Sequence, residues 1–177
     1  MGEIKSTLDL VMERTKNLSL SDEEKQAQKQ NEVESRIRGL LQKYLDGWLD
    51  QNQLKIDYES LKKDSELTDD SVMINEIFGR LDPNLDNRNL LEIIAKCCRL
   101  NPAALENLLN DCRREYGEAA DARKAQLKED LARTHAISGS AVVPNLETDA
   151  QWQREETNLR RRFEGLLNQE KDKALQG

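Results

Sequence analysis

Three cysteines are the side chains of this sequence best suited to metal or redox chemistry. Cys97 and Cys98 are adjacent, and Cys112 follows them on the next expected helix. A zinc site needs about four converging ligands, commonly with two to four residues between paired cysteines. Neighbouring side chains on a helix point about 100° apart, so the adjacent pair is poorly placed to share a metal ion. The spacing therefore favours a role for the three cysteines as small buried side chains of a core. We expect no metal site and no cofactor.

A single histidine, His135, is the only imidazole available for acid–base chemistry. The di-iron motif of helical bundles needs two histidines, and no Ser-His-Asp arrangement can be assembled from the sequence. Glycine-rich phosphate-binding motifs are also absent from the sequence. We therefore predict no catalytic residues and no enzyme activity, and near a helix end His135 suits an interaction with the helix dipole. An enzyme built from scattered carboxylates, lysines or a cysteine stays an alternative.

The strongest local positive charge comes from three consecutive arginines, Arg160, Arg161 and Arg162. They lie between Leu159 and Phe163. Three consecutive side chains spread around a helix and form no flat patch, so ion pairs with acidic neighbours are their expected role. The arginines are also our candidate contact surface for an acidic surface of a partner protein.

The composition is that of a polar, acidic chain with few aromatic side chains. Charged residues make up 34% of the 177 residues and aromatic residues 4%, and 27 basic against 34 acidic side chains give a net charge of −7. This charge repels nucleic acid, and no apolar stretch approaches the roughly 18 residues that span a bilayer. We predict no nucleic-acid partner, no membrane partner and, from the odd number of cysteines, a reducing cytoplasmic location.

The elements that position these side chains are expected to be helices, because leucine and isoleucine recur at helical spacing. The three prolines, Pro83, Pro102 and Pro144, each lie beside a turn signal. Proline lacks an amide donor and marks where helices end or begin. We therefore predict an all-α, elongated protein with long helices, for which a coiled coil is one arrangement, and a compact central helical unit.

The sequence divides into four segments. Residues 1–67 are expected to hold an N-terminal helix and a long amphipathic helix. Residues 68–135 are expected to form the central helical unit with a long helical extension. A loop is predicted over 136–147, and a C-terminal amphipathic helix over 148–177, with Thr148 as its candidate N-cap.

The first expected helix, over residues 3–16, has apolar side chains that share one face. These are Ile4, Leu8, Val11 and Met12. A capping box of Ser21 and Glu24 starts the next helix. The helical pattern of that element runs to about residue 63, with Gly47 and Asn52 as candidate interruptions.

An apolar stripe follows the long helix, with alternating steps of three and four residues. Its candidate interface residues are Ile37, Leu41, Tyr44 and Trp48. Such a stripe packs against another helix, either within a monomeric bundle or on a second chain. The sequence leaves both arrangements open.

The central unit is the part of the chain that is densest in leucine, isoleucine and cysteine. Its last helix is expected to start at Asn101 and Pro102. If this unit bound a peptide, it would present an exposed apolar cleft. Burial of four side chains against one another would argue against such a cleft: Leu90, Ile94, Leu105 and Leu109.

A short internal similarity relates residues 36–42 to residues 162–168, each with a glycine before two leucines. In a duplicated packing element, Gly39 and Gly165 would let two helices approach closely. Chance similarity in a leucine-rich helical chain is the alternative.

The opening residues 1–16 (MGEIKSTLDLVMERTK), followed by Leu18 to Ser21, resemble the start of short helical bacterial proteins of unknown function. The resemblance is confined to the N-terminal end of the chain. It implies a bacterial cytoplasmic protein without an assigned activity, and it transfers no site residues.

Together these features predict a non-enzymatic helical scaffold or adaptor that acts by protein–protein association, with a protein partner or with itself. The alternative is a peptide- or protein-binding module that uses the central helical unit. No small-molecule substrate is identifiable from the sequence.

Overall fold

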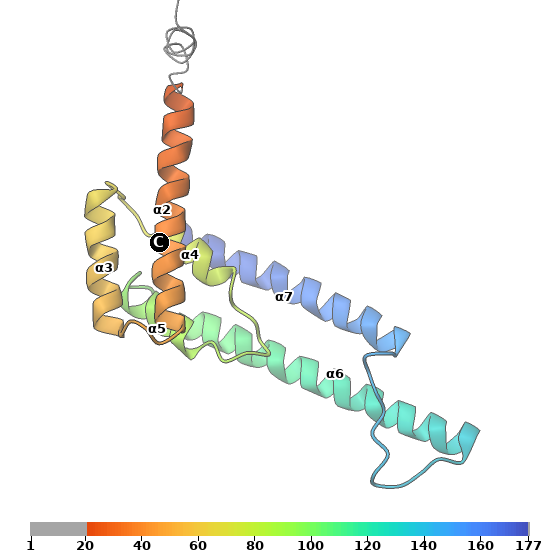
Figure 1. Ribbon diagram of the computed structural model, residues 1–177. Coiled ribbons are helices and arrows are strands. Elements are labelled where there is room, and N and C mark those ends of the chain that lie inside the picture. The colour runs from red at the N-terminus through yellow and green to blue at the C-terminus, as the bar shows by residue number, and fades with distance from the viewer. Residues whose placement is uncertain (1–20, 177) are drawn as a thin grey trace, which may run out of the picture.

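The computed structural model describes residues 21–176, and over this range the chain forms α-helices and no β-strand. In chain order the helices are α2 (Asp22–Leu45), α3 (Gln51–Asp64), α4 (Ser71–Phe78), α5 (Arg88–Lys96), α6 (Ala103–His135) and α7 (Ala150–Gln176) (Figure 1). The all-α prediction is confirmed. The helix expected over 3–16 lies outside the described residues. No helix within 21–176 is long and apolar enough to cross a membrane.

The helical run expected over 21–63 is divided in two at Gly47, one of the two candidate interruptions. Gly47 has a φ of 76°, a left-handed conformation that glycine adopts without strain. Asp50 then caps α3, because its carboxylate accepts a hydrogen bond of 2.8 Å from the amide of Gln53. As a result α3 turns back and runs beside α2 (Figure 1). Asn52 lies inside α3 and interrupts nothing.

The core lies where α2, α3, α4 and α5 meet the first turns of α6 and the last turns of α7. Side chains from four helices are almost completely buried there: Ile37, Leu41, Leu54, Tyr58, Met73, Ile77 and Ile93. They recur at helical spacing because one stripe of each amphipathic helix faces inward. The buried part of the apolar stripe predicted for the long helix therefore packs against other helices of the same chain.

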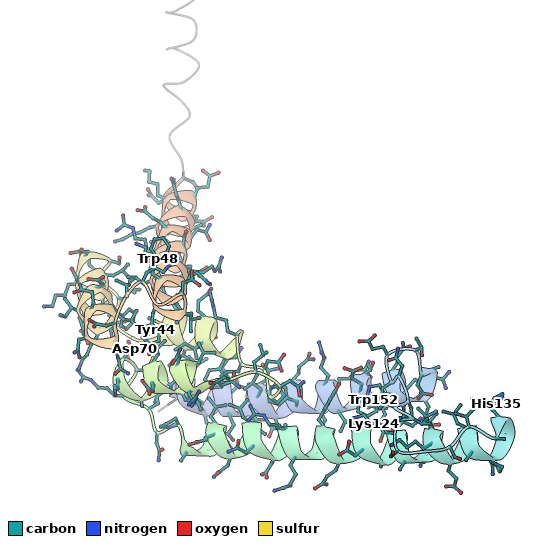
Figure 2. The ribbon with its side chains drawn as sticks, turned by 60° about the horizontal axis from the view of Figure 1, so that its bottom comes forward. Tyr44, Trp48, Asp70, Lys124, His135 and Trp152 are labelled. Atoms are coloured by element: carbon teal, nitrogen blue, oxygen red, sulfur yellow. The ribbon has the colours of Figure 1, made fainter. Side chains whose placement is uncertain are left out.

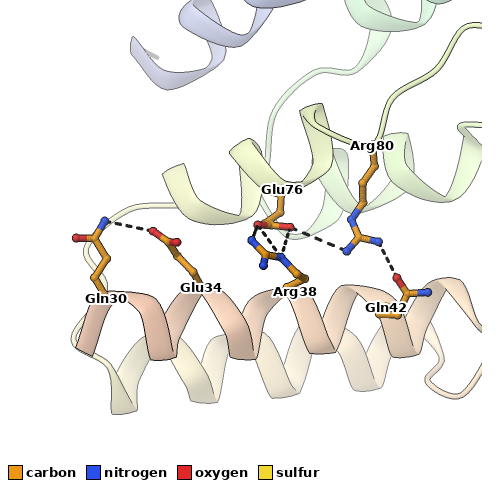
Figure 3. A network of polar contacts seen from close by, with 6 residues as sticks. All are labelled: Gln30, Glu34, Arg38, Gln42, Glu76 and Arg80. Carbon is orange, nitrogen blue, oxygen red and sulfur yellow. Dashed lines mark hydrogen bonds and ion pairs between the residues drawn. The ribbon is translucent and has the colours of Figure 1, made fainter. Parts of the chain in front are cut away.

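A polar network fastens α4 across α2 (Figure 3). Arg38 on α2 donates to both carboxylate oxygens of Glu76 on α4, with a shortest distance of 2.6 Å. Arg80, just after α4, lies 4.0 Å from Glu76 and donates to the side chain of Gln42 at 2.8 Å. The Arg38 guanidinium lowers the pKa of the Glu76 carboxyl, and its hydrogen bonds are the largest cause. These bonds fix the turn after α4 relative to α2.

Helices α6 and α7 form a hairpin that extends away from the core and gives the molecule an L shape (Figure 2). The 33 residues of α6 span about 50 Å. Trp152 of α7 is 4% exposed and packs edge-on against Tyr116 of α6, with 5.2 Å between ring centroids. This contact holds the hairpin together beyond the main core.

Asp149, rather than the expected Thr148, caps α7. Its carboxylate accepts a 2.7 Å hydrogen bond from the amide of Trp152 and two from Arg123 of α6, at 2.8 and 2.7 Å. The Arg123 guanidinium, and after it the Trp152 amide, lower the pKa of Asp149 to about 2 from 3.8. The carboxylate therefore joins the end of the α6–α7 loop to both helices.

We expect Asp149→Asn to loosen the start of α7 and to expose Trp152 at neutral pH. Because the folded pKa of Asp149 is depressed, its contribution to stability is present above pH 4 and is lost as the pH falls toward about 2. Trp152 fluorescence, recorded in a Trp48→Phe background, should therefore change over this range in the parent and much less in the variant. Asp121→Asn, which alters a carboxylate that is 80% exposed, is the control. Equal acid titrations in all three proteins would refute the assignment.

Candidate functional site

The four predicted interface residues on α2 and the following turn fall in different environments. Ile37 and Leu41 are completely buried within the chain, so in this fold they are core residues and offer no surface to another molecule. Tyr44 is half-buried at the edge of the core. Trp48 is 81% exposed in the turn between α2 and α3 (Figure 2). Of these four residues, Trp48 is the most exposed and Tyr44 is partly exposed, so the interface prediction now rests on these two.

The three arginines of α7 also differ from one another. Arg162 forms a two-point ion pair with Glu115 of α6, at 2.6 and 2.5 Å, which is the role expected for most of them. Arg160 is exposed and has no ion pair or hydrogen bond of its side chain within residues 21–176. Arg161 is exposed as well. Arg160 and Arg161 are therefore the cations of this group that are available to a partner.

Arg160 and Arg162 line a groove of about 370 Å³ between three parts of the chain. One wall is the turn over 78–84, the second is the face of α6 around Cys112 and Tyr116, and the third is the face of α7 from Leu159 to Asn168. We call this the α6–α7 groove. It lies where the hairpin leaves the core, so elements distant in sequence form its walls.

The α6–α7 groove has an apolar floor and a charged rim. Four of its apolar lining residues are Leu81, Leu159, Phe163 and Leu167. Leu81 and Phe163 are buried, whereas Leu159 and Leu167 are half-buried. The charged lining residues are Asp82, Glu115, Arg160, Arg162 and Glu164. A surface of this kind suits a ligand with an apolar face and polar edges.

The turn that forms the first wall is held in place by two side chains. Asn87 is 5% exposed and donates to the carbonyl oxygens of Asp82 and Leu85, at 2.7 and 3.0 Å. Arg113 of α6 donates to the carbonyl oxygens of Pro83 and Leu85, at 2.7 Å each. Because several backbone groups of the turn are bonded, the wall is fixed before any ligand arrives.

The thiol of Cys112 and the phenol of Tyr116, which both line the α6–α7 groove, are held in their protonated forms. Burial raises the pKa of the Cys112 thiol. Burial, and after it the hydrogen bond to Glu156, raise the pKa of the Tyr116 phenol to about 12. A protonated thiol and a protonated phenol are poor nucleophiles. The groove is therefore better suited to binding than to covalent chemistry.

The other side chains considered for chemistry are dispersed. Cys97 and Cys98 are buried, and burial raises the pKa of Cys98 to about 12. His135 is exposed at the end of α6 (Figure 2). Within the part of the chain that the structure describes, no three His, Cys, Asp or Glu side chains gather in a way that could hold a metal ion.

The two sequence features that suggested close packing or a central cleft do not produce them. A Cβ atom added at Gly39 or at Gly165 would meet nothing within 4 Å, so these glycines do not serve a close helix approach. In the central unit, four side chains are buried in one core: Leu90, Ile94, Leu105 and Leu109. Their burial disfavours a cleft among them.

Sequence reasoning identified the α7 side of the groove but not its other walls. The cluster at Arg160 was visible as charge beside Leu159 and Phe163. The roles of Asn87 and Arg113 depend on bonds to backbone carbonyls of residues far from α7. No spacing in the sequence signals such bonds.

In comparisons with known proteins, no protein-family model, no curated protein and no solved structure matches the chain. The resemblance of the opening segment to short helical bacterial proteins therefore stays a prediction.

Proposed function

We propose that this protein is a non-enzymatic helical scaffold that binds one amphipathic helix of a protein partner in the α6–α7 groove. The observation that carries the proposal is the groove itself, with half-buried Leu159 on its floor and Arg160 free at its rim. Protein–protein association through a helix in an apolar groove is a common mode of recognition.

The shape of the groove favours a helix as its occupant. Along α7 the lining runs from Leu159 to Asn168, a length of about 14 Å at the rise of an α-helix. Leu159, Phe163 and Leu167 follow one another at intervals of four residues and form a straight row. A second amphipathic helix can place its own row of apolar side chains against such a row.

The charges at the rim favour an occupant that carries both signs of charge. Arg160 lies on α7, and the carboxylates of Asp82 and Glu164 lie on the turn and on α7. The second cation, Arg162, is already paired with Glu115 at 2.5 Å. A helix with acidic and basic residues beside its apolar face can satisfy these groups, whereas a uniformly acidic or basic segment meets a like charge.

We expect Leu159→Glu to weaken partner binding at least tenfold, because it places a carboxylate on the apolar floor of a groove that Glu164 also lines. Thr157→Glu is the matched control, since Thr157 is exposed two positions earlier and points to another side of α7. Both variants are compared with the parent in quantitative co-purification from native extract. Circular dichroism verifies that each is folded.

A stoichiometric partner that is retained by the parent and by Thr157→Glu, and lost by folded Leu159→Glu, supports the proposal. Hydrogen exchange of the purified complex should then show protection of residues 159–168. A partner that both variants retain equally, without protection at α7, would exclude the groove. In that outcome exposed Trp48 becomes the surface to test, with Trp48→Ala.

A further inference from the structure

We propose that the α6–α7 groove takes the N-terminal segment, residues 3–16, of a second copy of this chain. The inference rests on the proposed function, because it names the partner at the same groove. The exchange would be reciprocal, so that each copy inserts its segment into the groove of the other and one two-fold axis relates them.

The N-terminal segment matches the groove in its apolar pattern and in its length. Its sequence places Ile4, Leu8, Val11 and Met12 on a single helical face. From Ile4 to Met12 such a face measures about 12 Å, close to the length of about 14 Å along α7. The segment also carries both acidic and basic residues beside this face. These suit the rim of the groove, which carries charges of both signs.

The first turns of α2, which follow the segment, provide almost no apolar surface. Every residue from 21 to 32 is exposed, and Ala27 is the only apolar one among them. The first buried side chain of α2 is Val33. The start of α2 therefore projects from the core (Figure 1) and presents no apolar row before Val33 against which another apolar face could pack.

The distance along α2 favours the groove of another copy over the chain's own groove. Arg80, beside the groove, is hydrogen-bonded to Gln42, and Asp22 lies about 30 Å from Gln42 along the helix. Even if residues 17–21 were fully extended, Met12 would reach only about 26 Å from Asp22. The Met12 end of the apolar face therefore cannot reach the chain's own groove, so the whole face cannot dock there. The groove of a second molecule is under no such limit.

A site-directed disulfide tests this arrangement, because Cys112 lines the groove and is half-buried. Leu8→Cys places a thiol on the apolar face of the segment, and Ser6→Cys places one on the opposite face. Copper–phenanthroline supplies the oxidant: the two thiols lose two protons and two electrons as the S–S bond forms. The full-length variants are oxidised at equal concentration and analysed by non-reducing electrophoresis and peptide mass spectrometry.

We expect Leu8→Cys to give a covalent dimer whose linked peptides contain residue 8 and Cys112, at a yield at least five times that of Ser6→Cys. Adding Cys112→Ser should abolish this dimer. A Leu8→Cys product of monomer mass, in which residue 8 is linked to Cys112 of the same chain, would show that the segment docks within its own molecule. That result would overturn the proposal that a second copy supplies the segment. Dimers that persist without Cys112, or the absence of any link to it, would overturn the docking.

The same proteins separate failure of this inference from failure of the proposed function. If no cross-link to Cys112 forms but folded Leu159→Glu still loses a different protein that Thr157→Glu retains, the groove binds a partner that is not this segment. If neither assay depends on the groove, both proposals fail.

Discussion

Replacing Ile37 with alanine is expected to lower the free energy of unfolding by about 2–5 kcal/mol. Ile37 is completely buried in the core that α2 shares with α3 and α4. Truncation removes buried apolar surface and leaves a cavity that close-packed neighbours only partly fill. Urea unfolding followed by circular dichroism measures the change, with the slope of the transition as a check that the unfolded state is unaltered.

The control for Ile37→Ala is Trp48→Ala. Trp48 belongs to the same predicted stripe but is 81% exposed, so its loss should change the free energy of unfolding by no more than about 0.5 kcal/mol. The two values distinguish packing within the chain from packing between chains. If Ile37→Ala were nearly neutral in the monomer, the face of α2 that carries Ile37 would not be buried in solution as it is in the fold.

The apolar stripe of α2 shows what periodicity predicts and where it stops. Spacing of three and four residues established that Ile37 and Leu41 share a buried face. It carried no information on whether the covering helix belongs to the same chain, because both arrangements require the same pattern. The answer depends on the left-handed turn at Gly47, which brings α3 back against α2.

Helix ends were predicted well where a local signal is strong. The capping box at Ser21 and Glu24 is present, with bonds of 2.7 and 3.1 Å. Asn101 accepts from the amide of Ala103 at 3.0 Å, at the start of α6. Asp149 was missed because Thr148 and Asp149 are adjacent and both residue types are accepted as N-caps. The choice is made by Arg123, whose position is set by the fold of the α6–α7 hairpin.

The candidate site was predicted only in part because its walls join through tertiary bonds. The charge of Arg160 is visible in sequence, but the sequence does not show that Arg162 is the arginine that pairs with Glu115. The opposite wall depends on Arg113 of α6, for which the sequence predicted no role. Its guanidinium donates to two carbonyl oxygens of the turn. Such a partner can be identified only once the fold is known.

Replacing Asp70 with alanine is expected to lower the free energy of unfolding by about 2–3 kcal/mol, the range for a partly buried hydrogen bond to a charged group. Asp70 precedes α4 and accepts hydrogen bonds from two side chains of α3, Tyr58 at 2.8 Å and Lys62 at 2.6 Å. Lys62 also lies 5.6 Å from the centre of the Tyr58 ring. Without the carboxylate, the buried phenol and the partly buried ammonium both lose their acceptor.

Tyr58→Phe tests the same contact from the other side and adds a dependence on pH. Burial, and after it the hydrogen bond to Asp70, raise the pKa of Tyr58 above its ordinary value. In the unfolded chain a tyrosine loses its proton near pH 10, whereas folded Tyr58 keeps its proton. The unfolded state therefore binds fewer protons above about pH 10, and stability falls as the pH rises.

We therefore expect the parent protein to lose more stability than Tyr58→Phe between pH 9 and pH 11, although Tyr58→Phe is less stable at pH 7 by about 1–2 kcal/mol. Urea unfolding of both proteins at each pH measures the difference. Asp50→Ala is a useful comparison, because it removes a carboxylate that caps α3 without a bond to Tyr58. A parallel alkaline decline in the parent and in Tyr58→Phe would show that another group governs it. The link between α3 and α4 would then rest on apolar packing and on Lys62 alone.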